Sequence, residues 1–172
     1  MVETTIAQIA AFATLAVNGA AAAFAGLRWW LVRPSEAAWP LLRAGQALAV
    51  VQAVAAGGLA IAGFAPADGL YWLYALLPVA IGFVAEQLRI VSAEQVLENR
   101  ELPDAEAVGA LPEAEQRSVV LAIMRRELGV MALAALVVAC LSLRAALVAQ
   151  GGRRSHDSGS SAALVVSSSQ RA

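Results

Sequence analysis

Four long runs of apolar residues, separated by short polar segments, dominate the chain. The first run, residues 6–27, carries no charge. At a rise of about 1.5 Å per residue, a helix of this length crosses a hydrocarbon core of about 30 Å. The pattern predicts an all-α, polytopic membrane protein in which residues 1–150 form an antiparallel four-helix bundle. The expected helices span about 6–27, 41–64, 70–101 and 112–149.

The third and fourth helices are longer than one membrane crossing requires. The third turns polar at Glu86, about 24 Å along its axis and therefore near its far membrane boundary. Beyond this point apolar residues recur at the spacing of an amphipathic helix: Ile90, Ala93 and Leu97. We expect membrane-embedded parts at about 70–90 and 128–149, and a hairpin of the third and fourth helices that extends out of the bilayer.

Proline and acidic residues mark the ends of this hairpin. Pro103 stops the third helix, because proline lacks the N–H that a helix interior requires. Pro112 suits the first turn of the fourth helix, and Glu113 and Glu115 suit its positive dipole end. The turn at 66–69 is short, so the second and third helices are expected to be antiparallel neighbours.

Both ends of the chain allow more specific predictions. Residues 151–172 are rich in Gly, Ser and Arg without a sustained period, which predicts a disordered tail. At the other end, residues 23–25 fit a signal-peptidase site, which leaves cleavage of the first helix as an alternative. However, the chain begins with Glu3 and no basic residue, and the apolar run exceeds the usual signal length of about 7–15 residues.

The distribution of arginine predicts the orientation in the membrane. The connections at about 28–43 and 91–127, with their flanks, hold eight arginines, whereas the N-terminus and the turn at 66–69 hold none: Arg28, Arg33, Arg43, Arg89, Arg100, Arg117, Arg125 and Arg126. The positive-inside rule therefore places both connections in the cytoplasm and both termini outside. Four further arginines would then lie outside, which disagrees with the positive-inside rule for the C-terminal part of the chain: Arg144, Arg153, Arg154 and Arg171.

Composition agrees with a lipid environment and excludes several functions. The chain is 60% hydrophobic, with a mean hydropathy of +0.68, against about 45–50% apolar residues in soluble domains. A net charge of −1 gives no reason to expect a nucleic-acid partner. The single Cys140 is expected to be a packing residue, and the single His156 lies in the tail. No haem or metal cofactor is therefore expected.

Polar residues gather at one predicted end of the bundle. They open the second helix, leave the third and enter the fourth: Arg43, Gln46, Glu86, Gln87, Arg89, Arg125, Arg126 and Glu127. Apart from Gln87, we take them as the candidate rim residues. Arginine suits phosphate and carboxylate, so they could bind an anionic ligand or a lipid headgroup. The alternative is structural ion pairing and snorkelling at the edge of a helix bundle.

Two amides and several small residues lie within the predicted spans. Asn18 and Gln52 are near mid-depth, where side-chain amides usually form hydrogen bonds between helices. No set of polar residues, Arg43, Gln46 and Gln52 included, forms a continuous polar stripe that would line a pore. Small residues on the second helix are spaced four apart, which either permits close helix packing or reflects an alanine-rich composition: Gly45 and Ala49, Ala53 and Gly57, Gly58 and Ala62.

Motifs of catalysis are missing from the sequence. It contains no G-x-S-x-G nucleophile elbow, no phosphate-binding glycine loop, no H-E-x-x-H and no paired carboxylates within a span. We therefore expect a protein that is not an enzyme.

Three runs carry a resemblance to known sequences. Asp-Gly-Leu-Tyr-Trp-Leu-Tyr at 68–74, Ala-Glu-Gln-Leu-Arg at 85–89 and the segment at 111–127 are similar to small four-helix membrane proteins of actinobacteria that have no assigned function. The resemblance covers about residues 43–144 and implies a bacterial inner membrane without catalytic residues. A fainter similarity is to the four-helix half of haem A synthase, whose defining histidines this chain lacks.

These observations lead to one main hypothesis and its alternatives. The main hypothesis is a non-enzymatic structural or accessory subunit of the bacterial plasma membrane. Its cytoplasmic hairpin would contact a membrane-protein partner or a second copy of the chain. The alternatives are a small transporter or channel for a small or anionic solute, the binding of lipid headgroups at the rim residues, and a membrane enzyme that acts on lipid-linked substrates.

Overall fold

The computed structural model describes the backbone of residues 2–33, 35–66 and 68–169, and side chains as far as Ala149. Regular structure in these residues is entirely α-helical: α1 (Val2–Trp30), α2 (Ala38–Ile61), α3 (Leu70–Glu98), α4 (Ala105–Gly109) and α5 (Glu113–Ser169). Among the described residues, four helices are long and apolar enough to cross a membrane: α1, α2, α3 and Glu113–Ala149 of α5. The expected all-α architecture with four long apolar helices is therefore present.

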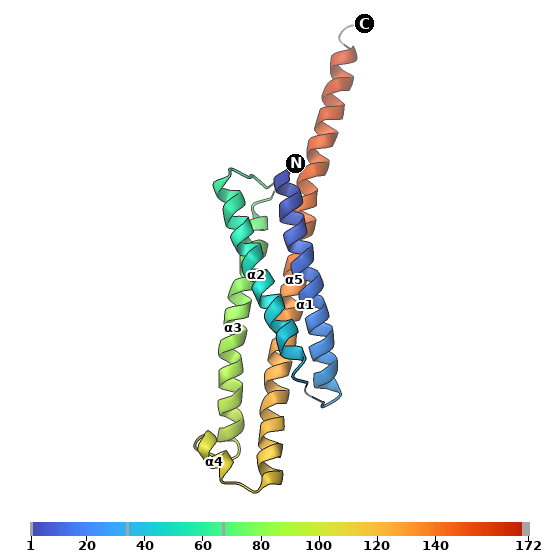
Figure 1. Ribbon diagram of the computed structural model, residues 1–172. Coiled ribbons are helices and arrows are strands. Elements are labelled where there is room, and N and C mark those ends of the chain that lie inside the picture. The colour runs from blue at the N-terminus through green and yellow to red at the C-terminus, as the bar shows by residue number, and fades with distance from the viewer. Residues whose placement is uncertain (1, 34, 67, 170–172) are drawn as a thin grey trace.

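The four long helices lie side by side in alternating directions (Figure 1). Helix α5 packs along both α1 and α3, and α2 packs mainly on α1. Helices α3 and α5 continue well past the connection between α1 and α2, with α4 at their tip (Figure 1). We call residues 90–127 the α3–α5 hairpin.

Alanine builds most of the interior. One cluster at the hairpin side of the bundle contains Ala25, Leu42, Ala85 and Leu128, and a second at the opposite end contains residues of all four long helices: Ala7, Ala56, Leu59, Tyr71, Ala75 and Ala149. Small side chains let helix backbones approach closely, which is how helices gain packing energy in lipid. Large apolar side chains point outward instead: Ile9, Val54, Ile61, Phe83 and Leu133.

Helix α1 is longer than its uncharged core. The sequence predicts 6–27, but the helix runs from Val2 to Trp30. The prediction stopped at charged residues, although Glu3 in the first turn and Arg28 in the last turn both suit the helix dipole. A charge at the correct end therefore extends this helix.

Helix α2 starts and stops three residues earlier than predicted, at Ala38 and Ile61. Pro40 lies inside its first turn, where the missing N–H is not needed. At the other end Gly63 adopts a left-handed φ of 83°. The N–H of Phe64 then donates to the carbonyl of Leu59 at 2.9 Å, which closes a Schellman motif and ends the helix.

Helix α3 ends at Glu98 and not at residue 101 as predicted. Glu101 has a left-handed φ of 59°, and the N–H of Leu102 donates to the carbonyl of Leu97 at 3.0 Å, which is again a Schellman closure. The chain then forms α4, capped by Asp104, whose Oδ1 accepts from the N–H of Ala107 at 2.8 Å. Helix α5 begins directly after Pro112.

The apolar face of the α3–α5 hairpin agrees with the predicted one only in part. On α3 the predicted Ala93 and Leu97 are partly buried and Ile90 is half exposed, whereas the fully buried residues are Ser92 and Val96. On α5 the buried residue is Val119. The inward face follows the position of α5, which the spacing of apolar residues on α3 alone does not reveal.

Two observations bear on the predictions about α5. The backbone of residues 151–169 continues the helix to Ser169, and Figure 1 shows this part projecting beyond the bundle. Disorder of the tail, residues 151–172, stays a prediction. A helix that is already nucleated adds one hydrogen bond for each residue fixed, so weak helix formers can still extend it. Residues 170–172 lie outside the described part. Cys140, expected to be a packing residue, is exposed on the outer surface of the bundle.

We predict that Val32→Gly stabilises the protein by about 1 kcal/mol. Val32 follows α1 with a left-handed φ of 53°, which a β-branched residue tolerates poorly and glycine adopts freely. Thermal unfolding of the purified protein in detergent measures the effect. As a matched control, Val54→Gly in the exposed interior of α2 should destabilise by about 1 kcal/mol, and equal shifts for both variants would contradict the argument.

Candidate functional site: a charged cluster at the edge of a cavity

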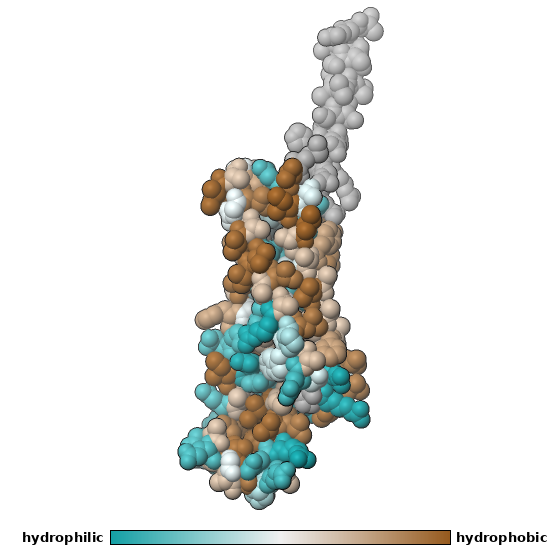
Figure 2. Space-filling model, in the orientation of Figure 1, coloured by the Kyte–Doolittle hydropathy of each residue, from teal (hydrophilic) through white to brown (hydrophobic). Residues whose placement is uncertain are grey.

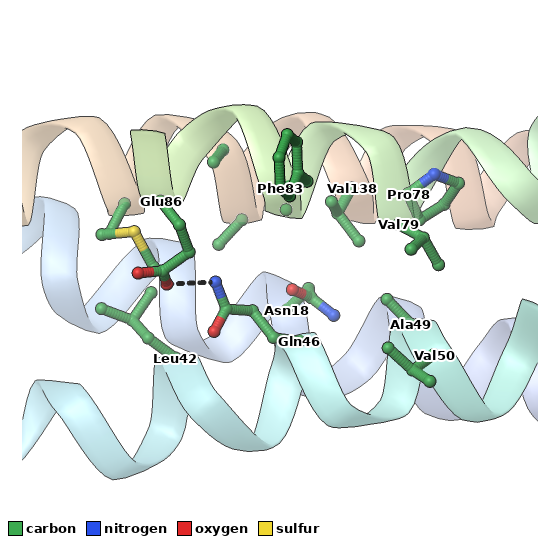
Figure 3. Close-up of a pocket in the computed structure, with 14 residues that line it drawn as sticks. Asn18, Leu42, Gln46, Ala49, Val50, Pro78, Val79, Phe83, Glu86 and Val138 are labelled. Carbon is green, nitrogen blue, oxygen red and sulfur yellow. Dashed lines mark hydrogen bonds between the residues drawn. The ribbon is translucent and has the colours of Figure 1, made fainter. Parts of the chain in front are cut away.

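Glu86 is the centre of a polar cluster between α2 and α3. Its Oε1 accepts a hydrogen bond from Nη1 of Arg43 at 2.7 Å. It also accepts one from Nε2 of Gln46 at 2.8 Å (Figure 3). Nη1 of Arg43 also donates to Oε1 of Gln46 at 2.9 Å. Nε of Arg89 lies 3.4 Å from Oε2 of Glu86. We call these four residues the Glu86 cluster.

Helical spacing brings the Glu86 cluster together. Arg43 and Gln46 are three residues apart on α2, and Glu86 and Arg89 are three apart on α3, so each pair occupies one face of its helix. The side chain of Glu86 is only 25% exposed, whereas that of Arg43 is 52% exposed. The carboxylate is thus sheltered between the helices while one of its cations reaches the surface.

Arg89 is held by charge and by an aromatic ring. Its guanidinium lies over the ring of Trp39, 5.3 Å from the centroid. Its Nε is buried and donates no hydrogen bond within the described residues. Burial raises the pKa of Glu127 on α5, while the positive charge of Arg89 lowers this pKa and the negative charge of Glu86 raises it. Three helices therefore contribute charge to this region.

Two of the candidate rim residues lie apart from the Glu86 cluster. The guanidinium of Arg125 lies over the ring of Trp29, 5.8 Å from the centroid, at the end of α1. Nη2 of Arg126 donates to Oε1 of Gln95 at 2.5 Å, across the α3–α5 hairpin. Arg125 and Arg126 have a similar position along the bundle axis but point to different sides of α5. They are therefore not neighbours of the Glu86 cluster.

A cavity of about 230 Å³ opens beside the Glu86 cluster. All four long helices contribute to its wall, as Figure 3 shows in part: Asn18, Leu42, Gln46, Ala49, Val50, Pro78, Val79, Gly82, Phe83, Glu86, Met131, Ala134, Ala135 and Val138. Apart from Asn18, Gln46 and Glu86, these residues are apolar. The cavity is therefore an apolar space with a polar edge.

Asn18 and Gln52 do join helices, but with different partners. Nδ2 of Asn18 donates to the carbonyl of Gly45 on α2 at 3.0 Å, and to the carbonyl of Thr14 at 3.0 Å. Oε1 of Gln52 accepts from the hydroxyl of Ser142 on α5 at 3.4 Å, while its Nε2 is buried and lacks a partner in the described part of the chain. The two amides thus fix separate helix pairs.

Several residues of this region escaped the sequence analysis. The hydroxyl of Thr14 bridges to the carbonyl of Leu48 at 3.3 Å, and Ser142 supports Gln52. Pro78 and Gly82 line the cavity. A proline inside an apolar span, followed four residues later by glycine, is a signal that could have identified this wall.

The residues of this region are suited to binding a ligand. The Glu86 cluster offers arginine and amide donors to an anion, and the cavity offers an apolar wall. Within the described residues, no group of three or more His, Cys, Asp or Glu side chains could hold a metal ion.

Comparison with known proteins provides no relative: no family model, curated protein or solved structure matches the chain. The similarity to actinobacterial membrane proteins therefore stays a prediction.

Proposed function

We propose that the protein is a non-enzymatic structural or accessory subunit of a bacterial inner membrane, and that it contacts a membrane-protein partner or a second copy of itself through the α3–α5 hairpin. The length of the helices supports this proposal. Glu113–Ala149 has 37 residues, about 55 Å of helix, whereas the hydrocarbon core is about 30 Å thick. A substantial part of α5 is thus available outside the bilayer.

The hairpin has its own stabilising contacts. Nη2 of Arg126 donates to Gln95, and Nη2 of Arg100 donates to the hydroxyl of Ser118 at 3.0 Å. At the tip, Nε2 of Gln116 donates to the carbonyls of Gly109 and Leu111. These bonds tie α3, α4 and α5 together along the length of the hairpin. A hairpin held in this way can present a defined surface.

Exposed apolar residues on the hairpin are the observation that carries the proposal. Four of them are between 44% and 52% exposed: Ile90, Val91, Val120 and Leu121. Figure 2 shows a polar belt across the bundle and, on its hairpin side, a second apolar zone before the polar tip. Two helices can bury only one face of each other, and contiguous apolar surface outside the lipid typically marks an interaction site.

Arginine distribution supports a cytoplasmic hairpin. The connection between α1 and α2 and the hairpin with its flanks carry the eight arginines named above, whereas no arginine lies in residues 2–27 or in the described residues between α2 and α3. Such a bias favours a cytoplasmic location for the side of the membrane that carries more arginine. Transport has less support, because the polar lining of the cavity is confined to Asn18, Gln46 and Glu86.

Photo-crosslinking in intact cells tests the proposal. A photoreactive amino acid in place of Val120 should give one adduct of defined mass, since the side chain of Val120 is 47% exposed on the α3–α5 hairpin. An adduct of twice the chain mass would identify a second copy, and a different mass would identify a partner subunit. The same amino acid in place of Ala114, which is exposed near the start of α5, is the matched control. Equal labelling at both positions, or none at Val120, would contradict the proposal.

A further inference from the structure

The cavity beside the Glu86 cluster is accessible from the side of the bundle. Three of its lining residues are also exposed on the outer surface: Val50 on α2, and Val79 and Phe83 on α3. Helices α2 and α3 make less extensive contact with each other than either α1 or α3 makes with α5. The opening therefore lies between α2 and α3, in the apolar part of the spans, where the surrounding medium is lipid hydrocarbon.

Small residues leave this space unfilled. Ala49, Gly82, Ala134 and Ala135 form much of the wall. A Cβ added at Gly82 would meet no atom within 4 Å. Apolar cavities of about 150 Å³ bind guests as large as benzene, so 230 Å³ accommodates a segment of one hydrocarbon chain.

Two arginines lie next to the polar edge of the cavity, which Gln46 and Glu86 form, and these arginines suit an anionic headgroup. Arg43 is half exposed, and Arg89 lies one helical turn beyond Glu86 on the same face of α3. Nε of Arg89 is buried and lies 3.4 Å from Oε2 of Glu86, so a phosphate would contact the Nη groups of Arg89, whose side chain is 29% exposed. Arg43 offsets the charge of Glu86. Arginine binds phosphate through several N–H donors in a fixed plane, and basic pockets between membrane helices bind lipid headgroups.

We propose that this site binds one membrane phospholipid, with one acyl chain in the cavity between α2 and α3 and the phosphate at Arg43 and Arg89. The order of the two parts matches the lipid, because the apolar space lies on the membrane side of the arginines. The site is separate from the apolar surface of the α3–α5 hairpin, so it stands or falls independently of the proposed subunit contact.

Native mass spectrometry of the delipidated full-length protein, titrated with phosphatidylglycerol, tests the proposal. The wild type should bind one lipid at saturation. Gly82→Leu should weaken binding about tenfold, because the new side chain occupies the cavity. Gly57→Leu is the matched control, since Gly57 also has open space around its Cβ but does not line the cavity. It should bind as the wild type does.

Two further arms separate the headgroup from the chain. Arg89→Gln should weaken binding of phosphatidylglycerol by a similar factor while Gly57→Leu leaves it unchanged. Glycerophosphate, which has the headgroup without acyl chains, should not displace the lipid. Equal binding by Gly82→Leu and Gly57→Leu would overturn the proposal, and so would full displacement by glycerophosphate, which would indicate a site for the phosphate alone. A thermal melt of Gly82→Leu that matches the wild type shows that its bundle is intact.

Discussion

Replacing Gly45 with alanine is expected to destabilise the bundle by about 1–3 kcal/mol, the usual cost of overpacking a tightly packed interior. A Cβ at this position would lie 2.6 Å from Oδ1 and 3.0 Å from Cγ of Asn18. Asn18 is buried and donates to the carbonyl of Gly45 itself, so it cannot move away without losing the bond that joins α1 to α2. Such interhelical bonds contribute about 0.6 kcal/mol. Equilibrium unfolding in mixed micelles measures the loss.

Two comparisons distinguish this clash from a general effect of the substitution. Gly57→Ala, on the same helix, meets no atom within 4 Å and should be neutral or stabilising, because alanine is the better helix former. Adding Asn18→Ala to Gly45→Ala should recover part of the lost stability, since it removes the atoms that clash. A Gly45→Ala protein as stable as Gly57→Ala would show that the helices are not in this contact.

Glu86→Gln is expected to cost about 1–2 kcal/mol, more than an exposed ion pair and less than a fully buried one. The substitution keeps the size of the side chain but removes the charge that Arg43 and Arg89 share. Both arginines then lose their carboxylate at a site next to an apolar cavity. Thermal unfolding in detergent at low and high salt measures the effect, which should shrink only slightly with salt because Glu86 is three-quarters buried.

The matched control is Glu113→Gln, which breaks the pair between Glu113 and Arg117 on α5. That pair has the same chemistry, but its side chains are 88% and 73% exposed. Its loss should change stability by no more than about 0.5 kcal/mol. If Glu86→Gln is as mild as Glu113→Gln, the Glu86 cluster does not hold α2 against α3.

Part of the candidate site could be predicted from residue depth alone. Glu86, Arg89, Arg43 and Gln46 stand at matching distances along two antiparallel helices, which is why their proximity follows from sequence numbering. Arg125 has a similar depth but faces Trp29. Depth is a one-dimensional property, whereas contact also requires the correct rotation of each helix about its axis.

Some helix ends can likewise be predicted from local sequence, whereas others depend on contacts with a neighbouring helix. Pro112 predicts the start of α5, because the stereochemistry of proline acts locally. The end of α2 depends on Gly63 adopting a left-handed φ, followed by Phe64 packing edge-on against Tyr71 and Trp72. That closure involves the next helix, so no run of residues on α2 alone specifies it.

The sequence by itself determined that the chain has four long helices, each long and apolar enough to cross a membrane. Each apolar run can be compared separately with the thickness of a bilayer, so this conclusion requires no knowledge of neighbouring helices. Tertiary structure alone decided which small residues are contacts. Gly45 and Ala49 are buried, whereas the similarly spaced Gly58 and Ala62 are exposed.

The physical reason is that α2 is apolar on nearly every face, and a helix that is hydrophobic all round carries little information about which side points inward. Packing among all four helices makes that choice. It also creates the cavity beside Glu86, because the space exists only where Gly82 of α3 faces Ala49 of α2 and Ala135 of α5.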